Sequence, residues 1–121
     1  MTSKELNLKL IEIFPEIKNT YLEETSWQDG DETGSHIVYG DVFVPFLKRE
    51  ITEKRTQILT NIFMFIEELL ELNDNYVNEV IAFSVFESLL FDDEVDNAFL
   101  IQYAKSNALK IIEEIIKEIG E

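Results

Sequence analysis

Residues 76–90, with the sequence YVNEVIAFSVFESLL, are the stretch that decides the fold. Apolar side chains recur here at helical spacing but point to nearly every side of the helix: Val77, Val80, Ile81, Phe83, Val85, Phe86 and Leu89. A helix that is apolar on more than one face normally lies in the middle of a fold. The sequence therefore predicts a central, buried helix at about residues 76–90.

The preceding segment, from about Glu53 to Leu72, has the clearest amphipathic pattern in the chain. One side of this predicted helix collects the apolar residues Ile58, Leu59, Ile62, Phe63, Ile66, Leu69 and Leu70. Glu67, Glu68 and Glu71 fall largely on the other side, which is typical of a helix face in contact with solvent. The polar run of residues 73–75 breaks the chain and caps the helix that follows.

Helical patterns also occupy both ends of the chain. Thr2 and Glu5 have the spacing of a capping box for the first helix. Pro15 ends or kinks that helix and, as a residue favoured at the first helical position, can also begin the next one. Asp41 is expected to cap a helix in the middle of the chain, and Asn107 is expected to cap the last helix.

Together these patterns predict an all-α fold. We expect a compact bundle of five or six mostly antiparallel helices around the helix at about 76–90. A chain of 121 residues suits a single helical domain, residues 1–121, with one hydrophobic core. A variation of this fold adds a short strand at Ile37–Tyr39.

The segment at about 25–36, TSWQDGDETGSH, predicts an acidic loop because it has turn-forming and acidic residues without a helical or strand period. Trp27 within it is either a binding residue among polar groups or a side chain that folds back onto the core. The candidate partner-binding residues are Trp27, Asp29, Asp31 and Glu32 in this loop, and Asp92, Asp93 and Glu94 in a second acidic turn.

Neither acidic segment has the pattern of a calcium site. A loop of the EF-hand type needs oxygen ligands at alternating positions and a glutamate at position twelve. Counted from Asp29, that position is Gly40, and counted from Asp92, it is Tyr103. The sequence therefore predicts no metal site.

The residues that usually carry catalysis are scarce. His36 is the only histidine and there is no cysteine, so neither a zinc ligand set nor a convincing nucleophile–histidine–acid triad can be assembled. There is no glycine-rich phosphate loop either. The sequence predicts a protein that is not an enzyme and carries no cofactor, with an enzyme based on two carboxylates as the less favoured alternative.

Charge is the most unusual global property. Asp and Glu total 25 against 10 Lys and Arg, which gives a formal net charge of −15. Such a chain repels nucleic-acid phosphates and anionic lipids and attracts basic surfaces. Its apolar runs are too short to span a membrane, and its first residues lack the apolar core of a signal peptide. We expect a cytoplasmic protein with a basic protein partner, without direct nucleic-acid or membrane contact.

Two resemblances bear on function. The stretches FPEIK (residues 14–18), GDVFVPFL (40–47) and FIEEL (65–69) resemble a family of small, acidic, helical bacterial proteins of unknown function. In size, acidity and helical build the chain is also similar to immunity proteins of bacterial toxin–immunity systems. Those proteins bind a cognate, often basic, nuclease toxin domain and block its active site or its substrate surface. This second likeness is one of type, so it assigns no residues.

The functional hypothesis is a binding protein that neutralises a basic partner, most concretely an immunity protein that blocks a bacterial nuclease toxin. Asp29, Asp31 and Glu32 would meet the Lys and Arg side chains with which the partner otherwise holds phosphate, and Trp27 would be an aromatic anchor. A nucleic-acid mimic, which needs a continuous acidic stripe, and a regulatory subunit are the alternatives.

Overall fold

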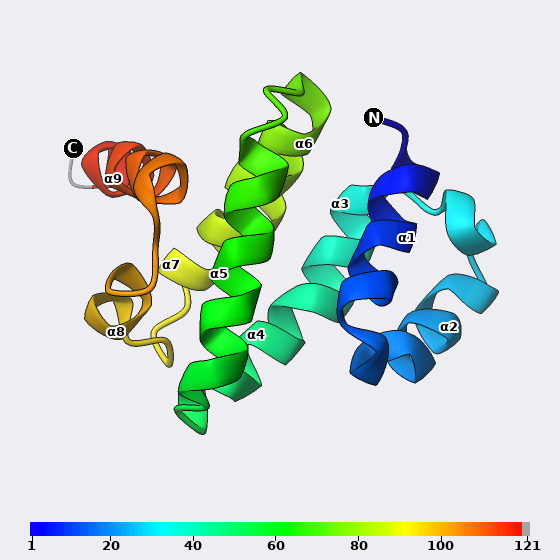
Figure 1. Cartoon of the computed structure of the whole chain (residues 1–121), viewed down its shortest axis with the longest axis horizontal. Helices are drawn as coiled ribbons and strands as arrows, with labels where there is room; N and C mark the ends of the chain where they lie inside the picture. The colour runs from blue at the N-terminus through cyan, green and yellow to red at the C-terminus, as the bar shows by residue number, and fades with distance from the viewer. Residues whose placement is uncertain (120–121) are drawn as a thin grey trace.

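The computed structural model of the chain describes residues 1–119 (Figure 1). Over this range it contains no strand, so the predicted all-α fold is confirmed. The same residues form seven helices, not the five or six expected, when residues 35–52 and residues 75–90 are each counted as one continuous helix. None of the helices in this range is both long enough and apolar enough to cross a membrane.

The first helix begins where the capping box predicted. In α1 (Ser3–Ile13), the Thr2 hydroxyl accepts a hydrogen bond from the backbone N–H of Glu5, and the Glu5 carboxylate accepts one from the backbone N–H of Thr2. After α1, a 3-10 turn, η1 (Pro15–Ile17), leads directly into α2 (Lys18–Ser26). The proline therefore separates two helices and opens the second, as expected.

The helix in the middle of the chain begins six residues before Asp41. It runs without a break through α3 (Ser35–Val38), a π-helical turn η3 (Tyr39–Phe43) and α4 (Val44–Thr52). The expected strand at Ile37–Tyr39 and the expected cap at Asp41 are therefore both wrong. Apolar residues at this spacing fit a buried helix as well as a short strand, so periodicity alone could not separate the two.

Pro45 gives a physical reason for the π-helical turn. A proline inside a helix has no N–H to donate, and its ring collides with the carbonyl four residues earlier. Directly before it, the backbone N–H of Val44 donates to the carbonyl of Tyr39, five residues back. This wider turn changes the position of the preceding carbonyls, so the helix continues through the proline.

α5 (Thr56–Leu70) is the predicted amphipathic helix, somewhat shorter than expected. The chain turns sharply on both sides of it, because Lys54 and Asn73 both adopt left-handed backbone angles, with φ of 53° and 54°. Those two turns set its bounds.

The second long helix follows. It consists of α6 (Asn75–Glu79), the π-helical segment η4 (Val80–Phe86) and α7 (Glu87–Leu90). The Asp74 carboxylate caps its first turn by accepting a hydrogen bond of 3.1 Å from the backbone N–H of Val77. The predicted break and cap at residues 73–75 are confirmed.

The described chain ends with the short α8 (Asn97–Ile101) and with α9 (Ser106–Ile119). α9 is capped not by Asn107 but by Glu67 of α5, whose carboxylate accepts hydrogen bonds from the backbone N–H groups of Asn107 (2.7 Å) and Ala108 (3.2 Å). Because Glu67 is only 6% exposed, its assignment to a solvated helix face is wrong.

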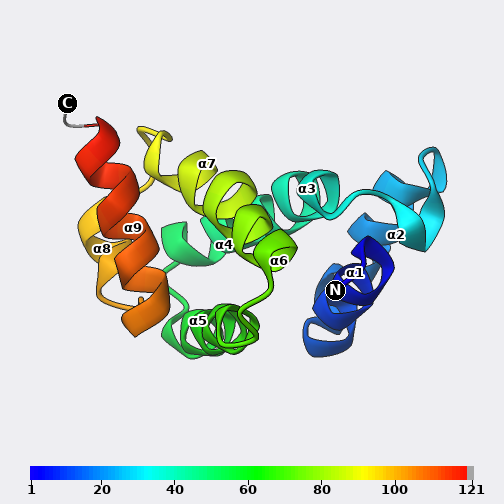
Figure 2. The ribbon, with the colours of Figure 1, turned by 90° about the horizontal axis from the view of Figure 1, so that it is seen from above.

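α5 and the helix of residues 75–90 form the middle of the molecule, with α1 and α2 on one side and α8 and α9 on the other (Figures 1 and 2). α5 packs on α4, α6 and α9, and the two π-helical segments η3 and η4 pack on each other. Next to α1 the core contains an aromatic cluster with ring centroids 5.4–6.2 Å apart: Phe14, Phe43, Phe46 and Phe65.

The helix of residues 75–90 buries a broad face but not its whole circumference. Its inaccessible side chains include Val77, Val80, Ile81, Val85, Phe86 and Leu89. Phe83, in contrast, is 56% exposed. The expectation that this helix is buried on nearly every side is therefore wrong at Phe83, and the open side of the helix forms one wall of a groove.

Candidate binding groove

The predicted acidic loop at 25–36 contains more helix than expected. α2 extends to Ser26, a 3-10 turn η2 (Gly30–Glu32) fills the middle of the segment, and α3 begins at Ser35. The sequence did not predict this short helical turn, because acidic and turn-forming side chains favour helix caps and turns over helix interiors.

Asn7 of α1 holds this segment in place. Its side-chain N–H₂ donates to the backbone carbonyls of Asp31 (3.0 Å) and Thr33 (2.6 Å), and its side-chain oxygen accepts a hydrogen bond of 2.8 Å from the Ser35 hydroxyl. Asn7 is completely buried. Its three hydrogen bonds compensate for the loss of water around a polar side chain in the core.

The predicted binding residues in this segment have different environments. Asp31 accepts a hydrogen bond of 2.7 Å from the Tyr21 hydroxyl, and burial together with this bond raises the pKa of Tyr21 well above its usual value. Asp29 and Glu32 are exposed, and Trp27 is 71% exposed. The alternative in which Trp27 folds back onto the core is therefore wrong.

The second predicted acidic turn is partly neutralised within the protein. Asp92 forms an ion pair with Lys48 and accepts a hydrogen bond of 2.9 Å from the backbone N–H of Glu94, while Asp93 and Glu94 are exposed. This turn and the segment around Trp27 lie toward opposite ends of the long axis (Figures 1 and 2). The structure therefore does not bring the two predicted acidic segments into one site.

We expect Asp92→Asn to destabilise the protein at neutral pH and to have little effect in acid. The Lys48 ammonium, followed by the Glu94 N–H, holds the pKa of Asp92 below its ordinary value of 3.8. A carboxyl whose pKa is lower in the folded state contributes stability above the unfolded-state pKa, and this contribution is lost as the pH falls through the folded-state pKa. Urea unfolding of both proteins at about pH 7 and about pH 2 measures the difference.

Asp93→Asn is the matched control for this experiment, because Asp93 is the exposed neighbour with no ion pair within residues 1–119. Its effect on the free energy of unfolding should be small at both pH values. A destabilisation by Asp92→Asn that stayed the same in acid would contradict the role assigned to the ion pair.

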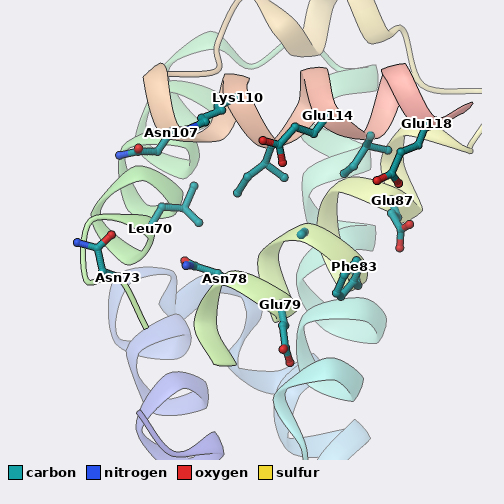
Figure 3. A pocket seen from close by; sticks show the side chains of 13 residues that line it. Leu70, Asn73, Asn78, Glu79, Phe83, Glu87, Asn107, Lys110, Glu114 and Glu118 are labelled. Carbon is teal, nitrogen blue, oxygen red and sulfur yellow. The ribbon is translucent and has the colours of Figure 1, made fainter. Parts of the chain in front are cut away.

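A more extended recess lies between α9 and the helix of residues 75–90 (Figure 3). This groove has a volume of about 430 Å³. Side chains from both helices and from the end of α5 line it: Leu70, Asn73, Asn78, Glu79, Ala82, Phe83, Glu87, Asn107, Lys110, Ile111, Glu114, Ile115 and Glu118. Two smaller hollows, of about 280 and 180 Å³, lie between the C-terminal end of α1 and α5.

The groove combines apolar surface with negative charge. Its apolar part consists of Leu70, Ala82, Phe83, Ile111 and Ile115. Among residues 1–119, its carboxylates are Glu79, Glu87, Glu114 and Glu118, against one cation, Lys110. Between low-dielectric walls this imbalance produces a negative potential that concentrates cations.

Helical spacing sets the arrangement of these carboxylates. Glu114 and Glu118 are four residues apart on α9 and therefore share one face, about 6 Å apart along the axis. Glu79 and Glu87 lie one before and one after Phe83 on the opposite wall. Figure 3 shows Glu87 and Glu118 toward one end of the groove and Asn73, Asn107 and Lys110 toward the other. The groove therefore has an acidic end and a neutral to basic end.

His36 contacts a residue that sequence spacing could not identify. Its Nδ1 lies 2.6 Å from the Ser84 hydroxyl of η4, and its ring meets the Tyr76 ring edge to face. A serine next to a histidine can act as a nucleophile only when further groups orient the base and stabilise an oxyanion. Within residues 1–119 no carboxylate is hydrogen-bonded to His36, so we interpret the pair as a bond between two helices.

The part of the chain that the structure describes also has no cluster of side chains suited to bind a metal ion. No three side chains of the His, Cys, Asp and Glu types converge there at a distance suited to one ion. The carboxylates of the groove belong to opposite walls and are therefore available to a cationic ligand with several charged groups.

Sequence reasoning missed the groove residues, although one signal was present. Phe83 has a glutamate four residues before it and another four residues after it, Glu79 and Glu87. Positions four residues apart lie on the same side of a helix, so acids at both positions indicate a face that reaches solvent. Glu114 and Glu118 gave no such signal, because a solvated helix face has the same pattern.

These observations define the chain as an acidic, all-α protein with an open groove rimmed by carboxylates. The chain belongs to the family DUF7674, a domain of unknown function, which matches residues 7–119. The expectation of a family without an assigned function is thereby confirmed, while the likeness to immunity proteins stays a prediction. No curated protein and no solved structure matches the chain.

Proposed function

We propose that this chain is a binding protein that takes up a basic segment of a partner protein in the groove between α9 and the helix of residues 75–90. The observation that carries the proposal is Phe83, which is 56% exposed in a recess whose walls hold four glutamates and one lysine. A large apolar side chain within negatively charged surroundings suits a ligand that is both apolar and cationic.

Charge and apolar contact would contribute to different parts of binding. The net charge of −15 draws a basic partner toward the molecule from a distance and is screened by salt. Covering the exposed half of Phe83 would contribute roughly 1 to 1.5 kcal/mol, which is about tenfold in affinity. Charge therefore governs the rate of encounter, and Phe83 governs the lifetime of the complex.

The narrower form of this proposal is an immunity protein that blocks a basic nuclease toxin. Its support is the surplus of acidic residues, together with the glutamates that line the groove around the exposed Phe83. The partner's Lys and Arg side chains would meet carboxylates of this protein in place of phosphate. A nucleic-acid mimic has less support, because the acidic segments around Trp27 and Asp92 lie toward opposite ends of the molecule (Figures 1 and 2).

A matched pair of aromatic variants tests the site. Basic proteins encoded by genes next to this one are the candidate partners to test. For one that binds, we expect Phe83→Ala to weaken binding by about tenfold and Trp27→Ala to change it by less than about twofold. Both side chains are largely exposed, so neither variant should unfold the protein. Titration calorimetry at low and at physiological ionic strength provides the measurement.

If Trp27→Ala alone weakens binding, the interface lies instead at the segment around Trp27, as the sequence predicts. Binding that does not weaken with added salt would contradict the electrostatic part of the proposal. A neighbouring product that does not bind at all would contradict the narrower form, the immunity protein.

A further inference from the structure

We infer that the occupant of the groove is an amphipathic basic helix, bound with its apolar stripe against Phe83 and its cationic side chains on the glutamate rims. This inference rests on the proposed function and specifies the ligand of the same groove. It names the conformation of the partner segment, the distribution of its charges and its direction along the groove.

The walls of the groove favour a helix over an extended segment. Both walls are helices, whose backbone N–H and C=O groups are already paired along the helix, and residues 1–119 contain no strand edge to which a peptide could add. An extended peptide on Phe83 and Ile111 would lose water from its backbone groups without gaining partners for them. A helix satisfies its own backbone hydrogen bonds and presents only side chains to the walls.

The shape of the groove also favours a helical occupant. A third helix can lie in the furrow between two helices, because side-chain ridges of one helix fit the grooves of another. α9 has 14 residues, which is about 21 Å of helix, so an occupant of about four turns would match the length of that wall. The apolar residues of the groove would meet one stripe of such a helix.

The charges of the rim match long cationic side chains on the flanks of this stripe. Lys and Arg extend their aliphatic parts along apolar surface and keep the charged end near water, which suits carboxylates at the edge of an open groove. Glu114 and Glu118, one helical turn apart, would pair with cations at the same spacing on the occupant. The carboxylates of Glu79 and Glu87 would receive cations from the other flank.

The two ends of the groove set the direction of the occupant. Glu87 and Glu118 lie at one end, whereas Lys110, Asn73 and Asn107 lie at the other (Figure 3). The more cationic half of the occupant would therefore lie beside Glu87 and Glu118. A uniformly basic peptide would place one cation near Lys110 and lose part of the attraction.

Synthetic peptides with the same composition test the conformation. One Leu/Lys peptide of about 14 residues has leucines at helical spacing, and its isomer alternates Leu and Lys as in a strand. At physiological salt we expect the helical isomer to bind with one-to-one stoichiometry and about tenfold more tightly, and to gain helical circular dichroism on binding. Phe83→Ala should weaken it by about tenfold, and Trp27→Ala should not.

Two substitutions that remove the same charge test the direction, with a helical isomer whose lysines all lie in one half. Glu118→Gln, at the acidic end of the groove, should weaken its binding by about twofold to fourfold, and Glu79→Gln, about two helical turns before Glu87 on the opposite wall, should weaken it less. Equal effects of both substitutions would overturn the assigned direction, because non-specific attraction to an acidic protein does not depend on position along the groove.

The two levels of the proposal fail in different ways. If the alternating isomer binds equally well or better and still depends on Phe83, the helical occupant is wrong while the basic ligand of the groove stands. If neither peptide depends on Phe83, the groove is not the site and both conclusions fail. Absence of saturable binding by the helical isomer overturns the inference.

Discussion

Asn7→Ala should lower the free energy of unfolding by about 3 to 4 kcal/mol, the largest effect expected of a single polar side chain in this protein. The substitution removes two hydrogen bonds donated to the carbonyls of Asp31 and Thr33 and one accepted from Ser35. These partners are buried or partly buried and would lose their hydrogen bonds without full access to water. The cavity left by the side chain adds to the cost.

Urea unfolding followed by far-UV circular dichroism measures this loss. Asn19→Ala on α2 is the matched control, because Asn19 is exposed, and its effect should stay within about 0.5 kcal/mol. Hydrogen exchange should quicken first in the segment that Asn7 holds, from Trp27 to Ser35. A loss below about 1 kcal/mol would mean that this segment is held by its other contacts.

Glu67→Ala should cost about 2 to 3 kcal/mol and should loosen α9 before the rest of the protein. The Glu67 carboxylate accepts hydrogen bonds from the N–H groups of Asn107 and Ala108 in the first turn of α9. Those N–H groups have no partner inside the helix, and the positive end of the helix dipole adds to the attraction for a carboxylate. Without Glu67, α9 is attached to α5 mainly by apolar contacts.

Two further substitutions are controls for the effect of Glu67→Ala. Glu67→Gln keeps an acceptor but loses the charge, so it should cost less than Glu67→Ala. Glu68→Ala removes the exposed neighbouring glutamate and should have almost no effect. Exchange of the α9 amides, measured by mass spectrometry, should quicken only in the Glu67 variants. An unchanged exchange pattern would contradict the capping role.

The helical framework could be predicted from the sequence because local signals define it. The apolar stripe of α5, the capping box at Thr2 and the break at residues 73–75 each depend on residues close together in the chain. The middle helix was partly missed, because its start at Ser35 follows an acidic segment that has the composition of a loop.

The remaining features depend on contacts between distant residues. Glu67 has the same spacing as its solvated neighbours, and only the position of α9, 40 residues further along the chain, gives it a partner. Phe83 belongs to a stretch that is apolar overall, and its exposure depends on how far α9 lies from the helix of residues 75–90. Periodicity describes one helix at a time and does not contain these distances.

The two π-helical segments also constrain how the length of this chain can vary. Each wide turn holds one residue more than a regular helical turn, so loss of that residue can restore a regular helix and leave the following side chains on the same faces. Loss of one residue from the regular segment before Leu89 in α7, in contrast, would rotate the following side chains by about 100° and turn Leu89 away from the core. Single-residue deletions among homologues should therefore occur at η3 and η4 as well as in the connections at 91–96 and 102–105.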